Sequence, residues 1–360
     1  MQTESASRKR WTTIGLIAAA VTLTGCSEKG VVRINGGGST FVDPLMKKWK
    51  KAYNDAKHAE VDYAPKGSGN GIQQMIAGTY HFGCTDAPMN KEELENARKN
   101  RGEVLHIPLV FGAVVPIYNL PELKDAKEPL HFSGPVLADI FLGNIKKWND
   151  PSLAALNPGV ALPDKGIVVV HRADPSGTTF IFTEYLSKVS PQWLEKVGPG
   201  AKDLGAKWQT GSGQPGNKGV AGHVSTTEGA LGYVELDYAQ ENKLAAGSMQ
   251  NKDGKVVMAN TESIVAAATA AAQNPPDDLC LSMIDQGGEK AYPICGTVWA
   301  VLYVNQPKEG PGNHLTEFMT WCVHDGQKLT AGTSYAPLPD SLVQKIDEKL
   351  KLVKVGTGVQ

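Results

Sequence analysis

The stretch IVVVHRADPSGTTF, residues 167–180, contains an apolar run rich in β-branched residues, a short polar turn and the beginning of a helical pattern. Runs of this length and composition favour strands, and Ser or Thr before an apolar-periodic stretch is typical of a helix N-terminus. Phe180, Tyr185 and Leu186 form the apolar side of the expected helix. The stretch therefore predicts a strand, a turn and a helix in succession, the repeating unit of an α/β fold.

Two earlier stretches repeat this order. Residues 31–34 predict a strand, followed by the glycine-rich turn 36–41 and by a helix with Asp43 as its N-cap. Residues 61–64 predict a second strand, and the turn 67–71 leads from it into a second helix. The α/β unit thus occurs three times, each time with a small, polar turn between strand and helix.

These three turns present backbone N–H groups where strands end and helices begin, and such places favour anions. The turn at 172–178 adds the Arg172 guanidinium and the Ser176 and Thr178 hydroxyls, a donor set that suits a tetrahedral oxyanion. Helix capping alone accounts equally well for Ser176 and Thr178 taken in isolation. The three turns together favour a ligand site.

Composition limits the possible classes of protein. The chain has 360 residues, of which 41% are hydrophobic and 20% charged, so it is long enough for two globular domains. Its 36 Lys and Arg residues balance 37 Asp and Glu residues, giving a formal charge of −1. No global positive field is present to hold nucleic acid or an acidic membrane surface.

The N-terminus has the layout of a secretory signal peptide over residues 1–25. Basic residues at 8–10 precede an apolar run at 11–21 that is too short to span a bilayer. The following Leu-Thr-Gly-Cys, residues 23–26, resembles the lipobox of bacterial lipoproteins, which implies a lipidated Cys26; an ordinary signal peptide cleaved nearby is the alternative. Residues 1–25 carry a net +2, so the mature chain has a charge of about −3 and is expected to be exported and tethered by its lipid.

Cysteine usage agrees with export. Apart from Cys26 the chain has Cys84, Cys280, Cys295 and Cys322, an even number in an oxidising compartment, for which three pairings are possible. We favour a Cys280–Cys295 disulfide, whose loop of about 15 residues is worth roughly 3 kcal/mol in the chain-entropy model; Cys84 and Cys322 are then buried thiols. No Cys-x-x-Cys or His-Glu-x-x-His motif occurs, so we expect no metal and no cofactor.

Catalytic motifs are missing as well. The glycine-rich stretch 211–219 places its lysine wrongly for a P-loop, and no serine has the glycine spacing of a nucleophile elbow. Asp86 and Asp174 are conceivable as an acid/base pair, but neither has a water-activating neighbour in the sequence. The residues therefore indicate binding and no covalent chemistry.

A specific resemblance appears when these turns are taken in order with three further stretches. From about residue 33 to the C-terminus, the chain resembles the PstS-like phosphate-binding proteins of ABC phosphate importers, which are periplasmic solute-binding proteins of the type II fold. The stretches that carry the resemblance are GSTF (38–41), GSGNG (67–71), FGCTDAP (82–88), LGNIKKWND (142–150), RADPSGTTF (172–180) and GALGYVE (229–235).

The resemblance implies an α/β fold of two lobes, each a mixed sheet flanked by helices, joined by two hinge crossings. Lobe I would comprise residues 26–113 and 298–360, and lobe II residues 114–297, with the apolar run 106–118 as a candidate crossing. The lobes would close on one phosphate ion like a hinged clamp.

The ligand contacts implied by the resemblance lie at matching positions only. Asp174 would orient Arg172, and Asp86 would accept the proton that hydrogen phosphate keeps at neutral pH and sulfate lacks. On the residues alone, Asp86 is equally a surface turn residue, Arg172 a solvated strand end and the Phe41 ring a core aromatic. Pro175 removes one possible N–H donor, and we assign no contact to the loop that contains Asn217. The implied phosphate-binding residues are Thr40, Phe41, Ser68, Asp86, Arg172, Ser176, Gly177 and Thr178.

We therefore expect a lipid-anchored, monomeric solute-binding protein outside the cytoplasmic membrane. It would capture inorganic phosphate and deliver it to an ABC permease with a cytoplasmic ATPase, and it would be neither an enzyme nor a nucleic-acid-binding protein. The alternatives are an exported phosphatase with a similar oxyanion cage, a sensor built on the same clamp, and a binding protein for another tetrahedral oxyanion. Among sulfate, molybdate and arsenate, only arsenate also keeps a proton at neutral pH.

Overall fold

The computed structural model describes residues 31–356 except 57, 58, 274 and 309. All elements named below belong to one compact unit, Val32–Gln360. The predicted signal peptide and the predicted lipidation site at Cys26 lie outside the described residues. Within the described part of the chain, no helix has the length and apolar character needed to cross a membrane.

Strands and helices alternate along the chain. The strands are β1 (Val32–Gly38), β2 (Ala59–Ala64), β3 (Phe82–Thr85), β4 (Val104–Tyr118), β5 (His131–Phe132), β6 (Val168–Arg172), β7 (Ser212–Gln214), β8 (Ala230–Glu235), β9 (Ala245–Ala246), β10 (Ser248–Gln250), β11 (Val256–Val257), β12 (Cys295–Tyr303), β13 (Asn305–Gln306) and β14 (Lys354–Val355). The helices are α1 (Asp43–Ala56), α2 (Ser68–Ile76), α3 (Lys91–Arg101), α4 (Gly134–Phe141), α5 (Pro151–Leu156), α6 (Gly177–Val189), α7 (Pro191–Lys196), α8 (Gly216–Thr226), α9 (Leu236–Glu241), α10 (Thr261–Ala271), α11 (Gly312–Val323) and α12 (Asp340–Leu350), with short 3-10 turns at Pro121–Leu123, Gly205–Lys207 and Asp325–Thr330.

The three predicted strand–turn–helix units are confirmed as β1–α1, β2–α2 and β6–α6. The predicted buried face of α1 is also confirmed, since Leu45, Met46, Trp49 and Tyr53 are all buried. Asp43 is the first residue of α1, and its carboxylate pairs with Lys47 one turn later, at 2.7 Å. The local pattern was therefore sufficient to predict the elements that carry the three turns.

Nine of the described strands form one curled mixed sheet in the order β2-β1-β3-β12-β4-β8-β6-β7, with β9 also paired to β4. The remaining strands form a small sheet in the order β11-β10-β5 and the pair β13-β14. β1 is parallel to β2 and β3, and β8 is parallel to β6, whereas β12 and β4 are antiparallel to each other. The long strand β4 pairs with β12 along residues 104–113 and with β8 along residues 114–118. One strand thereby joins the two halves of the sheet.

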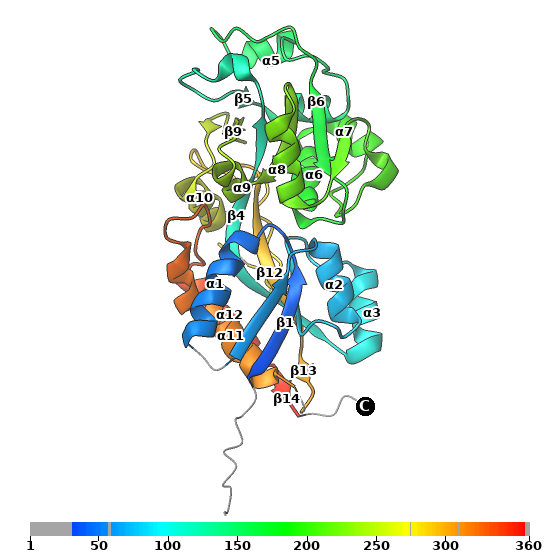
Figure 1. Cartoon of the computed structure of the whole chain (residues 1–360), viewed down its shortest axis with the longest axis vertical. Helices are drawn as coiled ribbons and strands as arrows, with labels where there is room; N and C mark the ends of the chain where they lie inside the picture. The colour runs from blue at the N-terminus through cyan, green and yellow to red at the C-terminus, as the bar shows by residue number, and fades with distance from the viewer. Residues whose placement is uncertain (1–30, 57–58, 274, 309, 357–360) are drawn as a thin grey trace, which may run out of the picture. The chain divides into compact units, whose positions relative to one another are not determined.

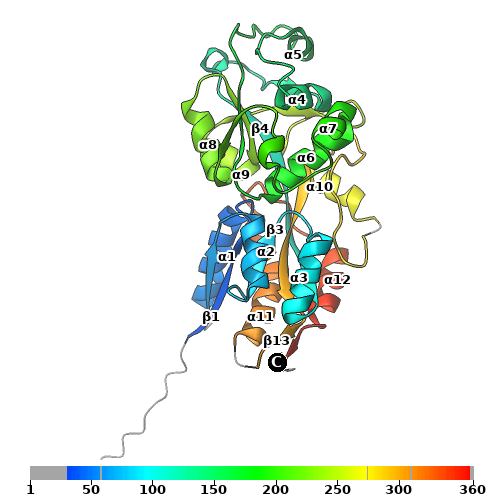
Figure 2. The ribbon, with the colours of Figure 1, turned by 90° about the vertical axis from the view of Figure 1, so that its right-hand side faces the viewer.

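Each half of the sheet carries its own helices, which gives the two-lobed α/β fold expected (Figure 1). We call β1–β3 with α1–α3 the first lobe, and β6–β8 with α6 and α8 the second. Figure 2 shows α2 and α3 on one half and α6 to α8 on the other, and in Figure 1 the label of β4 lies between the two halves. The predicted lobe boundaries at 113/114 and 297/298 fall within β4 and β12 and stay a prediction.

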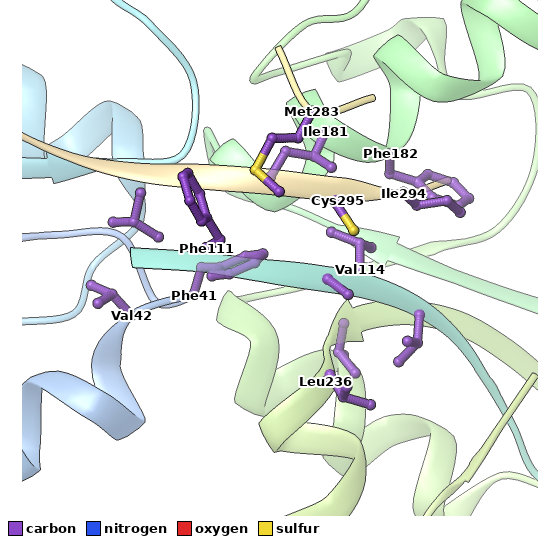
Figure 3. Close-up of a cluster of buried hydrophobic side chains, with 14 of the residues drawn as sticks. Phe41, Val42, Phe111, Val114, Ile181, Phe182, Leu236, Met283, Ile294 and Cys295 are labelled. Atoms are coloured by element: carbon purple, nitrogen blue, oxygen red, sulfur yellow. The ribbon is translucent and has the colours of Figure 1, made fainter. Parts of the chain in front are cut away.

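Two paired glycines lie in the strands that join the lobes. Gly112 of β4 is the direct partner of Gly296 of β12. A Cβ atom at Gly112 would lie 2.4 Å from the Phe41 ring, and one at Gly296 would lie 2.2 Å from Ile181. Side chains of both lobes therefore pack onto backbone that has no side chain of its own. Figure 3 shows Phe41 against β4 and Ile181 beside β12 in this buried cluster.

The predicted Cys280–Cys295 disulfide is wrong, because all four described thiols are free. The intervening segment folds back through a bridge between Ile284 and Ile294. This register places Cys295 next to Met283, three residues away from Cys280. The Cys295 thiol points to the Tyr292 carbonyl oxygen at 3.2 Å. Closeness in sequence therefore did not bring the two sulfur atoms into bonding geometry. Cys84 and Cys322 are buried thiols, as expected.

Candidate functional site

The structure brings the predicted site residues together where the two lobes meet. The first lobe supplies Thr40 after β1, Ser68 at the start of α2 and Asp86 after β3. The second lobe supplies the end of β6 and the beginning of α6. The side chains of Thr40, Phe41, Ser68, Asp86, Arg172, Ser176 and Thr178 are all less than 9% exposed, and Gly177 is buried as well.

Asp86 is the acidic centre of this cluster. Its side chain is 2% exposed, and it accepts a hydrogen bond from the hydroxyl of Ser39. Burial raises the pKa of Asp86 to about 7, although the Ser39 hydroxyl, the Arg172 charge and the hydroxyls of Thr178 and Ser68 act in the opposite direction. The alternative that Asp86 is a surface turn residue is thereby excluded, and the carboxyl group can take up or release a proton near neutral pH.

Arg172 is the cationic centre. Its Nε donates to Asp174 Oδ1 at 2.8 Å, and its Nη2 donates to Asp174 Oδ2 at 2.5 Å, so the pair that the resemblance implied is present and is bidentate. The backbone N–H of Gly216 donates to the same Oδ1 at 2.9 Å. Burial raises the pKa of Asp174, but these hydrogen bonds and the Arg172 charge outweigh it and hold the pKa below its ordinary value. Asp174 therefore stays ionised and fixes the guanidinium.

One donor of Arg172 has no partner in the described part of the chain. The Arg172 side chain is 1% exposed, and its Nη1 is buried without a hydrogen bond. A buried N–H group of a charged residue is costly to leave unpaired. The position therefore fits a negatively charged acceptor from outside the chain.

Ser68 connects the two lobes. Its Oγ accepts hydrogen bonds from the N–H of Asp86 at 3.3 Å and from the N–H of Gly177 at 3.1 Å. The N–H of Phe41 similarly donates to Ser39 Oγ at 3.0 Å. Two of the predicted backbone donors, those of Gly177 and Phe41, thus have hydroxyl partners inside the chain.

Ser176 is the N-cap of α6, with its Oγ accepting from the N–H of Thr179 at 3.2 Å. The capping interpretation is therefore confirmed for this residue. Since the hydroxyl acts as acceptor in the cap, its own hydrogen remains available for a second partner.

The Phe41 ring is fully buried in the core, where Gly112 packs against it, so its side chain is a core aromatic and only its backbone faces the site.

Glycines allow the lobes to approach closely. A Cβ atom at Gly177 would lie 2.6 Å from Asp86, and one at Gly69 would lie 2.5 Å from Pro175. At Gly67, which has a φ of 93°, a Cβ atom would lie 2.4 Å from Asp174 Oδ2. The N–H of Gly69 donates to the carbonyl oxygen of Pro175 at 3.1 Å. The two lobes are therefore in contact around the site.

Two residues of the cluster were missed by sequence reasoning. Ser39 bonds Asp86 directly, and its hydroxyl in the turn before Thr40 was the available signal. Asn217, at the start of α8, is fully buried and donates from Nδ2 to the hydroxyls of Thr40 and Thr178. Its loop was noted, but only the three-dimensional structure shows that the amide reaches both lobes.

A pocket of about 390 Å³ lies beside the cluster and is lined by both lobes. Thr40 and Lys66 line it from the first lobe, and Asp174, Gly216 and Lys218 from the second. Both lysines are exposed. The cluster behind this pocket combines a buried cation, a titratable carboxyl and several hydroxyl and backbone donors, a set that suits a small oxyanion carrying a hydrogen.

Comparisons with known proteins agree with this chemistry. Residues 20–325 match the family model described as the PBP superfamily domain. The phosphate-binding protein PstS of Pasteurella multocida (strain Pm70) is 42% identical over 318 residues, which cover 88% of this chain and 90% of that protein. The chain belongs to the PstS family. The PstS of Haemophilus influenzae (strain ATCC 51907 / DSM 11121 / KW20 / Rd) is 41% identical over 320 residues, covering 88% of this chain and 92% of that one.

Solved structures support the same fold. A high affinity periplasmic phosphate-binding protein, PfluDING, bound with phosphate at pH 8.5, matches with a TM-score of 0.73 and 17% sequence identity. The match covers 91% of this chain and all of that one. The expected two-lobed periplasmic-binding-protein fold is thereby confirmed for this PstS-family member.

Proposed function

We propose that this protein binds inorganic phosphate, as hydrogen phosphate, between its two lobes and delivers it to an ABC importer. The observation that carries the proposal is a buried guanidinium group and a buried carboxyl group in the same cluster. Arg172 holds a buried donor without a partner in the described part of the chain, and Asp86 holds a buried carboxyl group that lies close enough for the Arg172 charge to lower its pKa. The names of the PstS relatives support the same ligand.

A buried dianion loses its water shell, so the protein must replace many hydrogen bonds at once. The guanidinium of Arg172 supplies charge-assisted donors, held in place by Asp174. The hydroxyls of Thr40, Ser68, Ser176 and Thr178 add further donors in the proposal. When phosphate binds, the N–H groups of Phe41 and Gly177 would exchange their present acceptors, the hydroxyls of Ser39 and Ser68, for oxygen atoms of the ligand.

Asp86 gives the proposed selectivity. An ionised carboxylate accepts hydrogen bonds only, so it suits an oxyanion that still carries a hydrogen. Sulfate at neutral pH has no hydrogen, and its oxygen would face the Asp86 carboxylate without a bond between them. Sites built around one hydrogen bond can reject a ligand that lacks it by about 10⁴ to 10⁵.

The proposed transport step is lobe closure around the ligand. Contacts from both lobes reach the ligand only in the closed form, and this differential affinity shifts the population toward closure. The predicted lobe boundaries, the lipid anchor at Cys26, the monomeric state and the permease with its ATPase belong to this proposal. In this account the protein releases phosphate unchanged and carries out no covalent chemistry.

Calorimetric titration tests the proposal. The mature protein is stripped of bound anions and titrated at pH 7.5 with phosphate, and separately with sulfate. We expect one phosphate per chain with high affinity and no saturable heat with sulfate. Absence of phosphate binding, or sulfate binding of equal strength, would overturn the assignment. A chromogenic phosphomonoester incubated with the same sample should release no product.

A further inference from the structure

The amide of Asn217 lies between hydroxyl groups of the two lobes. Asn217 is fully buried on α8 of the second lobe. Its Nδ2 donates to Thr40 Oγ1 of the first lobe at 2.9 Å and to Thr178 Oγ1 of the second lobe at 3.2 Å. Both hydroxyls are among the ligand contacts of the proposed function, on which this inference rests.

The orientation of the amide is fixed by a third hydrogen bond. The backbone N–H of Glu235, at the end of β8, donates to Asn217 Oδ1 at 3.2 Å. Because a backbone N–H can only donate, the atom facing it must be the amide oxygen. The NH₂ group therefore faces the two hydroxyls, and its two hydrogens suffice for both.

This arrangement determines what the hydroxyl hydrogens can do. A threonine hydroxyl that accepts a hydrogen bond from Asn217 keeps its own hydrogen for another partner. Thr40 Oγ1 also lies 3.4 Å from the N–H of Asn217, which gives it a second donor on the same side. The hydroxyl of Thr178 is a hydrogen-bond partner of Asp86 and lowers its pKa, so its hydrogen would turn from the Asp86 carboxyl group to the ligand when phosphate binds.

We propose that Asn217 is a positioning residue for phosphate binding: its amide turns the Thr40 and Thr178 hydroxyls into donors toward the ligand and links the two lobes when they close. Without it, each hydroxyl is free to rotate and to act as an acceptor, which a phosphate oxygen cannot use. The cost then falls on the closed state, in which the amide links the two lobes.

The test combines substitutions at position 217 with changes at the two threonines. N217A removes the amide, and T40V and T178V remove the hydroxyls that it orients. We expect N217A to weaken phosphate binding about 10- to 100-fold in calorimetric titration. In the T178V and T40V backgrounds the same substitution should cost clearly less, because the group through which Asn217 acts is already gone.

N217D provides a second variant of the same shape. Its carboxyl group still accepts from the Glu235 N–H, but it would draw the threonine hydrogens to itself. We expect phosphate binding to fall at least as much as in N217A, while the ligand-free protein still unfolds cooperatively on heating. N157A is the matched control. Asn157 is 3% exposed and makes three hydrogen bonds to His131 and Leu153 in the chain segment of β5 and α5.

The outcomes separate the inference from the proposed function. If the unaltered protein binds no phosphate, the proposed function fails, and this inference fails with it. If the unaltered protein binds but N217A and N217D stay within about twofold of it, only the inference is overturned. It is also overturned if the losses of phosphate affinity caused by N217A and by the threonine substitutions simply multiply in the double variants. A third contrary result is that N217A, like N157A, lowers the melting temperature of the ligand-free protein but does not weaken phosphate binding.

Discussion

Gly177 of the second lobe packs directly on the carboxyl group of Asp86 of the first lobe. A Cβ atom at position 177 would lie 2.6 Å from Asp86 Cβ and Oδ2, closer than real Cβ contacts occur. The N–H of the same glycine donates to Ser68. The acidic centre thus has room in the closed form only because residue 177 has no side chain.

A G177A substitution is therefore expected to prevent full closure. The added methyl group must push the start of α6 away from Asp86, and the contacts of the two lobes then no longer reach one ligand together. We expect phosphate affinity, measured by calorimetry, to fall at least 100-fold. G222A is the control, since a Cβ atom at Gly222, also within a helix, meets nothing within 4 Å. Equal affinity of G177A and G222A would contradict this explanation.

The Arg172–Asp174 pair predicts the effect of D174N. The amide cannot hold the guanidinium by two charge-assisted bonds, so Arg172 loses both its fixed position and its buried counter-charge. We expect phosphate affinity to fall about tenfold or more, and the free energy of unfolding in urea to fall by about 1–3 kcal/mol. D164N is the matched control, because the Lys147–Asp164 pair is more than 60% exposed on both sides and such pairs contribute little. D174N binding phosphate as tightly as D164N would argue against a role for Asp174.

Lys202 and Glu93 form an ion pair at 2.6 Å whose side chains are 13% and 21% exposed. Glu93 belongs to α3 of the first lobe, and the carbonyl oxygen of Lys202 accepts from the N–H of Ser176 at 2.8 Å. The pair therefore links the first lobe to the loop that presents the start of α6.

We expect K202M to weaken phosphate binding about three- to tenfold, mainly through faster release, because the pair stabilises the closed form. Stopped-flow measurement of association and dissociation rates checks this. An unchanged dissociation rate would show that the pair does not hold the lobes together. K147M serves as the control for removing a lysine from an exposed pair.

Much of this site follows from local sequence. The turns at 36–41, 67–71 and 172–178 were predictable because strand, cap and helix patterns are short-range. The pairing of Asp174 with Arg172 was expected from the family resemblance. Asn217 was not predictable in this way. Its proposed role depends on hydrogen bonds to Thr40, which lies 177 positions earlier in the chain, and to Thr178, which lies 39 positions earlier.

The wrong disulfide has a related physical cause. The spacing of Cys280 and Cys295 allows a bridge, but the direction of a side chain depends on strand register, which the backbone bridge between Ile284 and Ile294 determines. Ser39 illustrates the converse. It lay within a recognised stretch, yet only the packing of β1 beside β3 brings its hydroxyl to Asp86.

The raised pKa of Asp86 predicts a pH dependence of the ligand-free protein. Burial makes the folded protein bind this proton more tightly than the unfolded chain, whose Asp has a pKa of 3.8. Stability must then fall as pH rises from about 4 toward 7 and level off above that, by up to about 1.4 kcal/mol per pH unit. We expect the melting temperature of phosphate-free protein to drop between pH 5 and 8, and to drop less in D86N. Identical slopes for the two proteins would contradict the raised pKa.

The most direct test of the whole account is the ratio of phosphate to sulfate affinity in the unaltered protein and in D86N, measured by competition at pH 7.5. The amide oxygen of the variant accepts less strongly, and its NH₂ group can donate to sulfate. We predict a ratio of about 10⁴ or more for the unaltered protein, and a ratio at least tenfold smaller for D86N. The same ratio in both proteins would contradict the claim that the Asp86 carboxylate selects the oxyanion by its hydrogen.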